Sequence, residues 1–258
     1  MADLSVVIIA QDEERTIGAV LKAVNKIAKE IILVDSGSTD KTIEIAQSYG
    51  TICHHKPWQG YAAQKNFALS LATSSWILSL DADEVITADL ANEIERTFRQ
   101  PKDQQFNGYL IPRILYIGKT AITHGGFYPD AQLRLFKTGK AEFKPRLVHE
   151  SATVQGRIGH LKNPIRHYSY VDFADYEKAL DKYARLSAQE FAKSSDLTWR
   201  TSKLNEWLHP WWTFFYRYVL RGGFFDGAAG LKANWLYQNY VRKKITYLRQ
   251  LVDSGSQP

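Results

Sequence analysis

Two aspartates separated by one residue directly follow an apolar segment of the chain. The segment Trp76 to Leu80 is typical of a buried strand, and Asp81-Ala82-Asp83 comes next. Two carboxylates at a strand end can both reach a divalent ion that bridges phosphates, and Mg²⁺ or Mn²⁺ suits such oxygen ligands. A solvated acidic turn is the alternative, but the position after a buried-type strand favours a metal and phosphate site. An EF-hand loop is excluded, because its glycine and final glutamate positions hold Ile86 and Asn92.

Polar residues also follow two earlier apolar runs. Leu4 to Ala10 precedes Gln11-Asp12-Glu13, and Ile31 to Val34 precedes Asp35. Continuous apolar runs indicate strands buried on both faces of a parallel sheet, and ligands of such sheets bind beyond the carboxyl ends of the strands. Asp35 can accept hydrogen bonds from a nucleoside there, and a turn or helix-capping role stays open as the alternative.

Helical patterns separate these strands. Apolar residues recur at helical spacing from about residue 14 to residue 27, and further helices are predicted up to about Tyr49 and from about Tyr61 to Ala72. This alternation of strand and helix predicts a doubly wound α/β sheet with helices on both faces.

The second half of the chain has a different pattern. Alternating residues after Pro101 predict antiparallel or mixed strands, and a helix is predicted from Asp172 to about Lys193. One alternating segment places on a single face the residues Tyr109, Ile111, Arg113 and Leu115.

Composition and charge narrow the class of protein. The 258 residues, 45% hydrophobic and 23% charged, suit one folded core with an extension. The net charge of +6 favours an anionic partner: a phosphorylated substrate, an anionic membrane or a nucleic acid. The single cysteine, Cys53, excludes an intrachain disulfide framework and a cysteine zinc site, and we expect it to be a packed thiol.

Several common nucleotide sites and membrane segments are excluded. The turn after the first strand lacks a Gly-x-Gly-x-x-Gly pattern, and no Walker A loop occurs. The N-terminus lacks the features of a signal peptide, so we expect the chain to begin inside the cell. Arg217 and Arg221 interrupt the best candidate for a spanning helix, so a membrane contact would be peripheral.

Several motifs accompany the acidic residues at the strand ends. They are Leu4 to Ala10 with Asp12-Glu13-Glu14, Val34 to Thr42, Gln64-Lys65-Asn66, Leu80 to Glu84, Phe127 to Asp130, Gln132 to Phe136, and Val148-His149-Glu150. This set resembles the family 2 glycosyltransferases, and more narrowly the branch of bacterial lipopolysaccharide core β-1,4-glucosyltransferases. The resemblance covers most of the chain and implies a GT-A fold, a Rossmann-like mixed sheet flanked by helices.

The resemblance also implies roles for individual residues. Asp83 would coordinate Mg²⁺ or Mn²⁺. The residues implied for binding the nucleotide-sugar donor are Ala10, Glu13, Asp35, Lys65 and Asp81. The turn Gln11-Asp12 departs from the family, which often has an asparagine there.

The family's reaction is a single displacement with inversion at the anomeric carbon. It needs a carboxylate that takes the acceptor's proton and a cation that neutralises the departing diphosphate. Asp130 and Glu150 are the candidate bases, and Asp130 is favoured because it follows Gly125-Gly126 and a proline; an ion pair with an arginine is the alternative for Glu150. Arg134 is a candidate phosphate clamp. His149 is a candidate metal ligand, with a structural hydrogen bond as the alternative.

Residues 207–251 combine aromatic and basic side chains and contain a single acid, Asp226. Such a mixture suits an interfacial helix on an anionic membrane. Packing on the catalytic domain or in a dimer is the alternative for residues 228–251, so the oligomeric state stays open. We expect a catalytic domain over residues 1–200, with a nucleotide-sugar half over about 1–100 and an acceptor half over about 101–200. A helical extension over 201–252 and a disordered tail over 253–258 would follow.

The sequence therefore predicts a cytoplasmic, inverting glycosyltransferase at the inner face of the cytoplasmic membrane. It would move a hexose, with UDP-glucose as the favoured donor, onto a hydroxyl of a lipid-linked or lipopolysaccharide-core-type glycan. Two other classes stay open. A haloacid-dehalogenase-like phosphotransferase would use Asp81 as its nucleophile, but the second acidic pair that it needs is missing. A basic nucleic-acid-binding protein would leave the strand-end acids unexplained, so no nucleic acid partner is expected.

Overall fold

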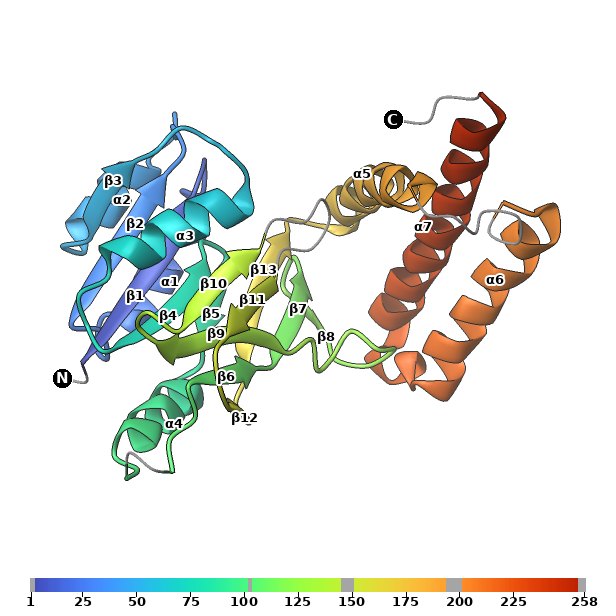
Figure 1. The fold of residues 1–258 in the computed structure, drawn as a ribbon. Coiled ribbons are helices and arrows are strands. Elements are labelled where there is room, and N and C mark those ends of the chain that lie inside the picture. Colours follow the sequence, from blue (N-terminus) through green and yellow to red (C-terminus); the bar gives the residue numbers. More distant parts are fainter. Residues whose placement is uncertain (1–2, 102–103, 145–150, 194–200, 255–258) are drawn as a thin grey trace. The chain divides into compact units, whose positions relative to one another are not determined.

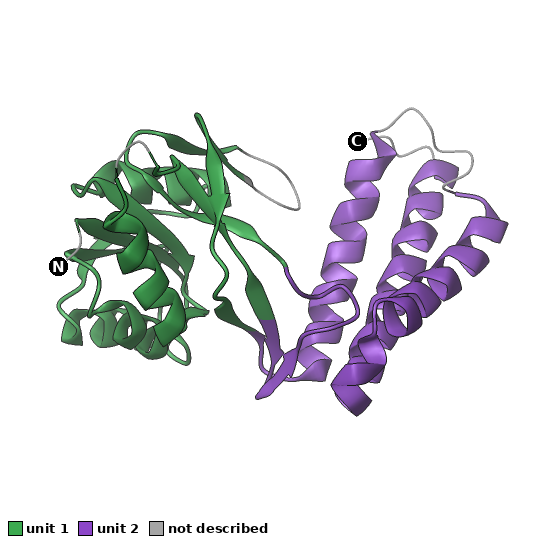
Figure 2. Cartoon of the chain, turned by 90° about the horizontal axis from the view of Figure 1, so that it is seen from below, with its two compact units in different colours: residues 1–114, 130–168 green, residues 115–129, 169–258 purple. Residues whose placement is uncertain are grey.

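The computed structural model describes residues 3–101, 104–144, 151–193 and 201–254. The chain forms two compact units, one of Met1–Ile114 with Asp130–Tyr168 and one of Leu115–Pro129 with Ser169–Pro258 (Figure 2). Strands β7 (Arg113–Ile117) and β13 (Ile165–Tyr170) contribute residues to both units. The first unit is built around a sheet, and the second is mainly helical.

A seven-stranded mixed sheet organises the first unit. In spatial order its strands are β12 (Ile158–His160), β6 (Gly108–Ile111), β9 (Gln132–Lys137), β4 (Trp76–Asp81), β1 (Leu4–Ala10), β2 (Glu30–Asp35) and β3 (Ile52–His55). Strands β4, β1, β2 and β3 are parallel, whereas β9 is antiparallel to both of its neighbours (Figure 1). The predicted mixed α/β sheet is confirmed, and the four parallel strands end at one edge.

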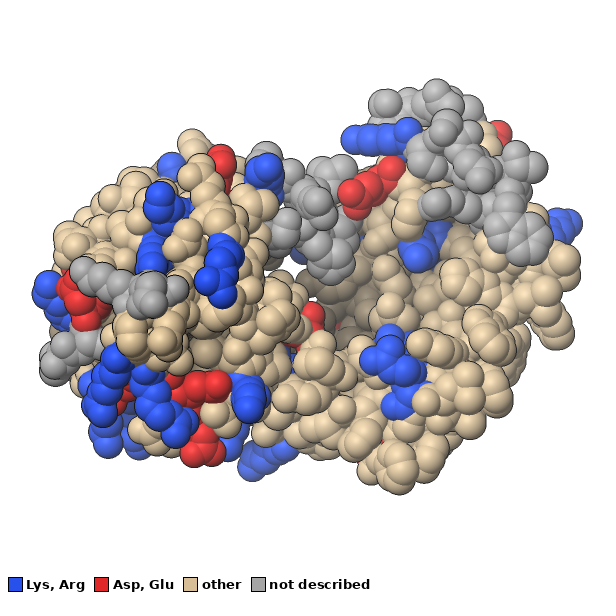
Figure 3. All heavy atoms as spheres, turned by 60° about the horizontal axis from the view of Figure 1, so that its bottom comes forward, with Lys and Arg blue, Asp and Glu red and all other residues tan. Residues whose placement is uncertain are grey.

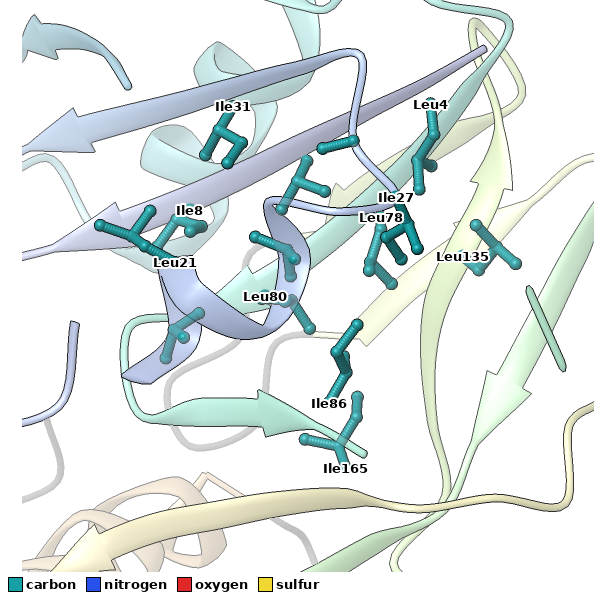
Figure 4. Close-up of a cluster of buried hydrophobic side chains, with 14 of the residues drawn as sticks. Leu4, Ile8, Leu21, Ile27, Ile31, Leu78, Leu80, Ile86, Leu135 and Ile165 are labelled. Carbon is teal, nitrogen blue, oxygen red and sulfur yellow. The ribbon is translucent and has the colours of Figure 1, made fainter. Parts of the chain in front are cut away.

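Helices cover both faces of this sheet. They are α1 (Ile17–Val24), α2 (Thr42–Ser48), α3 (Tyr61–Leu71) and α4 (Ala88–Phe98). Side chains of a strand alternate between faces, so Ile8 of β1 packs in the cluster that includes α1, whereas Val7 packs in the cluster that includes α3. Figure 4 shows Ile8 and Leu21 in the first of these clusters. A strand enclosed on both faces needs apolar residues at every position, which explains the continuous apolar run of β1.

Two local predictions differ from the structure. Helix α1 begins at Ile17 rather than near residue 14, because the Glu13 carbonyl accepts hydrogen bonds from the amides of Thr16 and Ile17 in a preceding turn. The residues from Tyr109 to Leu115 do not share one face of one strand. They divide between β6 and β7 in different sheets, because Pro112 lies between them and has no amide hydrogen to continue the ladder.

Two smaller sheets are present among the described residues. One has the order β5-β13-β7-β8, in which β5 is Glu84–Ile86 and β8 is Thr120–Ile122. The other pairs β10 (Ala141–Lys144) with β11 (Ser151–Val154) in antiparallel fashion. Asn66 connects β10 to α3, one of the helices that cover the large sheet. Its Nδ2 donates to the carbonyl of Phe143 and its Oδ1 accepts from the amide of Phe143, both at 2.8 Å.

The second unit contains α5 (Phe173–Ala192), α6 (Lys203–Phe215) and α7 (Gly227–Asp253). The short helical segments η1 (Tyr216–Leu220) and η2 (Gly223–Asp226) lie between α6 and α7. The predicted α5 is confirmed, with Asp172 accepting the amides of its first turn as the cap.

The apolar stripe of α7 is directed into this unit. Ala233 and Leu236 pack with Tyr176 and Leu180 of α5. The sequence left open whether this stripe packs within the protein or contacts a membrane. In the structure the stripe packs against α5. No helix among the described residues is long and apolar enough to cross a bilayer. The predicted disordered tail falls outside the described residues, apart from Asp253 at the end of α7 and the following Ser254.

Candidate active site

The carboxyl ends of the parallel strands bring the predicted donor-site residues to one edge of the sheet. The strand register pairs Ala10 with Asp35, and Asp81 lies beside the end of β1. Asp83 follows the end of β4, and its backbone carbonyl accepts a hydrogen bond from the amide of Tyr168 at 2.9 Å. Ligands of doubly wound sheets bind at such an edge, so a donor site at this edge stays a prediction.

Asp35 is buried and organises the loop after β2. Its Oδ2 accepts hydrogen bonds from the amides of Gly37 and Ser38 at 2.8 and 3.0 Å, and its Oδ1 accepts one from the Ser38 hydroxyl. Gly37 has a φ of 109°, which favours glycine. These are the contacts of a turn-forming aspartate, so a hydrogen bond to a nucleoside would be an additional one.

The loop after β1 is joined to the same turn. The amide of Asp12 donates to the Ser38 hydroxyl at 2.9 Å, and Asp12 Oδ1 accepts from the amide of Thr39 at 2.8 Å. Asp12 has a φ of 54°, a left-handed conformation that aspartate tolerates better than most residues. The amide of Glu13 donates to the Thr42 hydroxyl at 2.7 Å. Asp12 and Glu13 thus connect the two loops.

The carboxylate of Glu13 lies near Asp83. Burial raises the pKa of Glu13, and the negative charge of Asp83 raises it further, against an opposing hydrogen bond from Thr16. Glu13 is therefore easier to protonate than an ordinary glutamate, and a cation or a hydrogen-bond donor at this edge would be stabilised by both acids.

Asp81 lies between two basic side chains. Its Oδ1 is 2.8 Å from Nζ of Lys65, and its Oδ2 is 2.5 Å from Nη2 of Arg134. Burial alone raises the pKa of a carboxyl group, but the charges of Arg134 and Lys65 hold the pKa of Asp81 well below its usual range. Asp81 is therefore ionised and engaged in internal ion pairs.

The ion pairs continue through Glu84, to which the sequence assigned no role. This fully buried carboxylate accepts hydrogen bonds from Nη2 of Arg134 at 2.6 Å and from Nη1 of Arg113 at 2.7 Å. Arg113 in turn contacts Asp130, with 2.5 Å between Nη2 and Oδ2. The result is a continuous series of alternating charges, which runs through Lys65, Asp81, Arg134, Glu84, Arg113 and Asp130.

Arg134 occupies the centre of this series. Its side chain is buried, and one nitrogen contacts both Asp81 and Glu84. In this position Arg134 orients the two carboxylates at the end of β4. Its contact with a phosphate stays a prediction.

Asp83 lies outside the series and pairs with His167, a second residue without a predicted role. Their side chains are 19% and 20% exposed, and Oδ2 lies 3.3 Å from Nε2. Burial lowers the pKa of a histidine, but the hydrogen bond and the charge of Asp83 raise the pKa of His167 overall. A carboxylate oxygen and an imidazole nitrogen both suit a divalent ion such as Mn²⁺.

The protein supplies only part of a metal coordination sphere. No group of three or more histidine, cysteine, aspartate or glutamate residues that could hold a metal occurs within residues 3–101, 104–144, 151–193 and 201–254. Asp83 and His167 nevertheless fit an ion that takes its remaining ligands from phosphate oxygens and water, as Mg²⁺ commonly does. The donor set is thus compatible with a metal bound together with a diphosphate.

The remaining predicted residues lie elsewhere. His149 and Glu150 are outside the described residues, so their predicted roles have no structural description. His124, a residue of the second unit without a predicted role, has Nδ1 2.8 Å from Oδ1 of Asp226. Cys53 is a half-buried free thiol whose pKa is raised by burial, in agreement with a packed cysteine.

A mixed α/β sheet with carboxylates at its edge agrees with the predicted GT-A fold. Residues 5–120 match glycosyl transferase family 2. An uncharacterised glycosyltransferase of Rickettsia typhi is 30% identical over 272 positions, which cover 99% of this chain and 92% of that relative. The lipopolysaccharide core biosynthesis glycosyltransferase LpsC of Rhizobium meliloti is 29% identical over 198 residues, 74% of this chain and 72% of LpsC. The chain belongs to glycosyltransferase family 2, which confirms the resemblance.

Solved structures show the same fold. The mannosyltransferase PcManGT of Pyrobaculum calidifontis, in complex with GDP-Man and Mn²⁺, has a TM-score of 0.55 at 16% identity and covers 95% of this chain and 86% of its own. S. aureus TarS 1-349 in complex with UDP-GlcNAc has a TM-score of 0.50 at 15% identity, covering 99% and 92%. The predicted GT-A fold is confirmed. Family membership identifies the chain as a transferase, rather than a haloacid-dehalogenase-like phosphotransferase or a nucleic-acid-binding protein.

Proposed function

We propose that this glycosyltransferase moves a hexose from a nucleoside diphosphate sugar, with UDP-glucose as the favoured donor, onto a hydroxyl of a lipid-linked or lipopolysaccharide-core-type glycan. The observation that carries the proposal is Asp83 at the carboxyl edge of the sheet, free of the internal series of ion pairs and 3.3 Å from His167. The similarity to LpsC, which is named for lipopolysaccharide core biosynthesis, supports the acceptor class.

The donor half of the site uses the loops at the strand ends. We assign the nucleoside contacts to Ala10, Glu13 and Asp35, and the metal contacts to Asp83 with His167. The bound Mg²⁺ or Mn²⁺ would neutralise negative charge on the departing diphosphate. PcManGT, which holds GDP-Man together with Mn²⁺, supports a divalent cofactor.

The role of Lys65 and Arg134 in this proposal is to position Asp81. Both cations contact its carboxylate, at 2.8 and 2.5 Å, and they fix the strand end from which Asp83 extends. A rigid support of this kind keeps a binding group in its productive geometry.

The acceptor half uses Asp130 as the general base. The acceptor hydroxyl oxygen forms a bond to the anomeric carbon on the face opposite the diphosphate, the bond from that carbon to the diphosphate breaks, and the hydroxyl proton passes to Asp130. The configuration is thereby inverted. Asp130 is 48% exposed, so a substrate can approach it. Arg113 and Gln132 orient its two oxygens, at 2.5 and 2.9 Å. Glu150 is the second candidate base.

The acceptor's lipid would be reached through the second unit. Large apolar side chains are exposed on α6, η1 and η2, and two of them, Trp212 and Phe225, are 60% and 69% exposed. Exposed aromatic residues with basic neighbours favour binding at an anionic membrane surface. We therefore propose peripheral attachment at the inner face of the cytoplasmic membrane.

The central test measures donor binding and hydrolysis. Purified protein is incubated with Mn²⁺ and one of several nucleotide sugars, and the melting temperature and the release of nucleotide are recorded. UDP-glucose with Mn²⁺ should raise the melting temperature most, because a ligand that binds only the native state stabilises it. If no nucleotide sugar produces a metal-dependent shift, the proposed function is wrong.

A further inference from the structure

The second unit contains an arginine that contacts two aromatic rings. The guanidinium carbon of Arg217, in η1, lies 4.3 Å from the ring centre of Phe127 and 3.9 Å from that of Tyr237. The faces of aromatic rings attract cations. The two rings meet edge to face, with their centres 6.0 Å apart and their planes at 87°. They therefore contact the guanidinium from two directions and restrict its orientation.

The charge of Arg217 has no anionic partner within the described parts of the chain. No ion pair there includes Arg217 or its neighbour Arg221, and the buried Nε of Arg217 has no hydrogen-bond partner. Burial lowers the pKa of Arg217, and the positive charge of Arg221 lowers it further. A largely buried cation with an unsatisfied donor is unfavourable unless an anion compensates it.

The acid nearest in sequence is engaged elsewhere. Asp226 is the only acidic residue among residues 207–251. Its Oδ1 accepts from the Thr123 hydroxyl at 2.8 Å, and its Oδ2 accepts from the amides of Thr123 and His124 at 2.9 and 2.8 Å. Asp226 therefore holds the loop that begins at Thr123 and does not neutralise the two arginines.

The two guanidinium groups converge beside a glycine. A Cβ atom at Gly126 would lie 3.3 Å from Nη1 of Arg217 and 3.6 Å from the guanidinium carbon of Arg221. The amide of Gly125 donates to the carbonyl of Arg221 at 3.0 Å, which holds this loop against the end of η1. Because Gly126 has no side chain and Arg221 is exposed, a small ligand can approach both guanidinium groups.

We propose that Arg217 and Arg221 bind a phosphate group beside Gly126. Two guanidinium forks match the oxygens of a phosphate and supply the counter-charge for a dianion. Two kinds of molecule carry this chemistry, a soluble phosphate ester such as a phosphorylated saccharide and the phosphate of a lipid headgroup. Figure 3 shows that much of the viewed surface of the helical unit is uncharged, with basic side chains set in it. This site consists of residues of the second unit alone, so phosphate binding there does not depend on the identity of the sugar donor.

The test measures binding of inorganic phosphate to the full chain, with saturating UDP and Mn²⁺ added so that the donor site is occupied. Isothermal titration and thermal shift are recorded for the wild type, Arg221→Gln and Arg217→Lys. The lysine variant keeps the positive charge beside the two rings but loses the forked guanidinium group. The matched control is Arg242→Gln, which removes the same charge from an exposed position of α7. We expect both site variants to bind phosphate at least about tenfold more weakly than the wild type and the control.

A second arm identifies the source of the phosphate. Glucose 6-phosphate and vesicles that contain phosphatidic acid are each titrated against the same proteins. Selective loss of glucose 6-phosphate binding in Arg221→Gln assigns the site to soluble phosphate esters, and selective loss of vesicle binding assigns it to lipid. If Arg221→Gln and Arg242→Gln behave alike towards all three probes, the proposal is overturned. Asp83→Asn should bind phosphate normally, so a failure of the proposed transfer reaction is distinguished from a failure of this site.

Discussion

Arg113 and Asp130 form a short ion pair, with 2.5 Å between Nη2 and Oδ2. The same guanidinium contacts the buried Glu84 at 2.7 Å, and Glu84 accepts a hydrogen bond from the amide of Asp81. A single arginine thus connects the end of β4, which carries the proposed donor site, to the proposed base. Replacing it should affect both the stability of the buried series and the titration of Asp130.

As the pH is lowered, the Arg113→Met variant should lose activity at a higher pH than the wild type does. Burial raises the pKa of Asp130, but the charge and hydrogen bonds of Arg113 hold it below the usual value of 3.8. A base acts only when deprotonated, so removal of Arg113 should raise the pKa of Asp130 and move the acidic limb of the kcat/KM profile upward.

The measurement is the dependence of kcat/KM on pH for the wild type, Arg113→Met and Arg113→Lys. The lysine variant keeps a positive charge and should show a smaller displacement of the acidic limb. Arg99→Met, which removes an exposed arginine paired with Glu95, is the control. An acidic limb that does not move in Arg113→Met would show that Asp130 is not the base.

The Arg134→Met variant should lower the free energy of unfolding by about 3–5 kcal/mol, because it leaves the buried Glu84 and the half-buried Asp81 with fewer cationic partners. Urea denaturation at neutral pH measures the loss. In the double variant with Glu84→Gln the loss should be smaller than the sum of the two single losses, because one of the uncompensated charges is gone. Additive losses would contradict the coupling between these residues.

The Asp83→Asn variant should lose about 100- to 1000-fold in kcat, the range found when one group that stabilises transition-state charge is removed. Its melting temperature without ligand should be close to that of the wild type, because Asp83 lies outside the buried series of ion pairs. Asp89→Asn, an exposed aspartate at the start of α4, is the matched control. Full activity of Asp83→Asn with Mn²⁺ would contradict the proposed metal site.

Local pattern accounts for much of the fold of the first unit. The bounds of β1 are the predicted Leu4 to Ala10, because a strand enclosed on both faces shows its whole length as an apolar run. Strand β5 was not predicted, since its three residues carry too short a pattern. The division at Pro112 was missed because the alternation on either side continues in phase although the strands belong to different sheets.

The sequence predicted those residues of the candidate site that follow the ends of parallel strands. It did not predict the residues that reach the site through the pairing of distant strands. Asp35 and Asp81 meet because parallel strands end at one edge. The partners of Glu84 are 29 and 50 residues away, at Arg113 and Arg134. His167 pairs in register with Glu84 across β13 and β5, which brings it to Asp83. No local spacing encodes these contacts, because they depend on which distant strands become neighbours.

Within the helical unit, the stability contributed by Asp181 should depend on pH. Hydrogen bonds from Lys243, Tyr247 and Arg185 lower the pKa of Asp181 from 3.8 to about 2. A carboxyl whose folded pKa is lowered stabilises the native state above its unfolded pKa, and this stabilisation is lost as the pH falls towards the folded pKa. Because the side chain is 28% exposed, screening limits the contribution to about 1 kcal/mol.

Urea denaturation of the wild type and Asp181→Asn at pH 7 and near pH 2.5 tests this contribution. The wild type should be more stable by that amount at pH 7, and the difference should shrink at acidic pH, where Asp181 begins to be protonated. Asp253→Asn, which removes an exposed carboxylate at the end of α7, is the control. A difference that is constant with pH would indicate a role for Asp181 other than its charge.

The exposed aromatic residues of the second unit should determine binding to anionic vesicles. Trp212 and Phe225 are 60% and 69% exposed, and replacing both by serine removes apolar area that would enter the membrane interface. Full burial of one such side chain contributes about 1.5–3 kcal/mol, and about 1.4 kcal/mol corresponds to tenfold in affinity. The double variant should therefore bind vesicles of phosphatidylglycerol at least about tenfold more weakly in a sedimentation assay at low salt.

Ile52→Ser, which removes an exposed apolar side chain from β3, is the control. Equal binding by the double variant and the control would exclude these aromatic residues as the membrane contact, even if the wild type binds vesicles through its basic side chains.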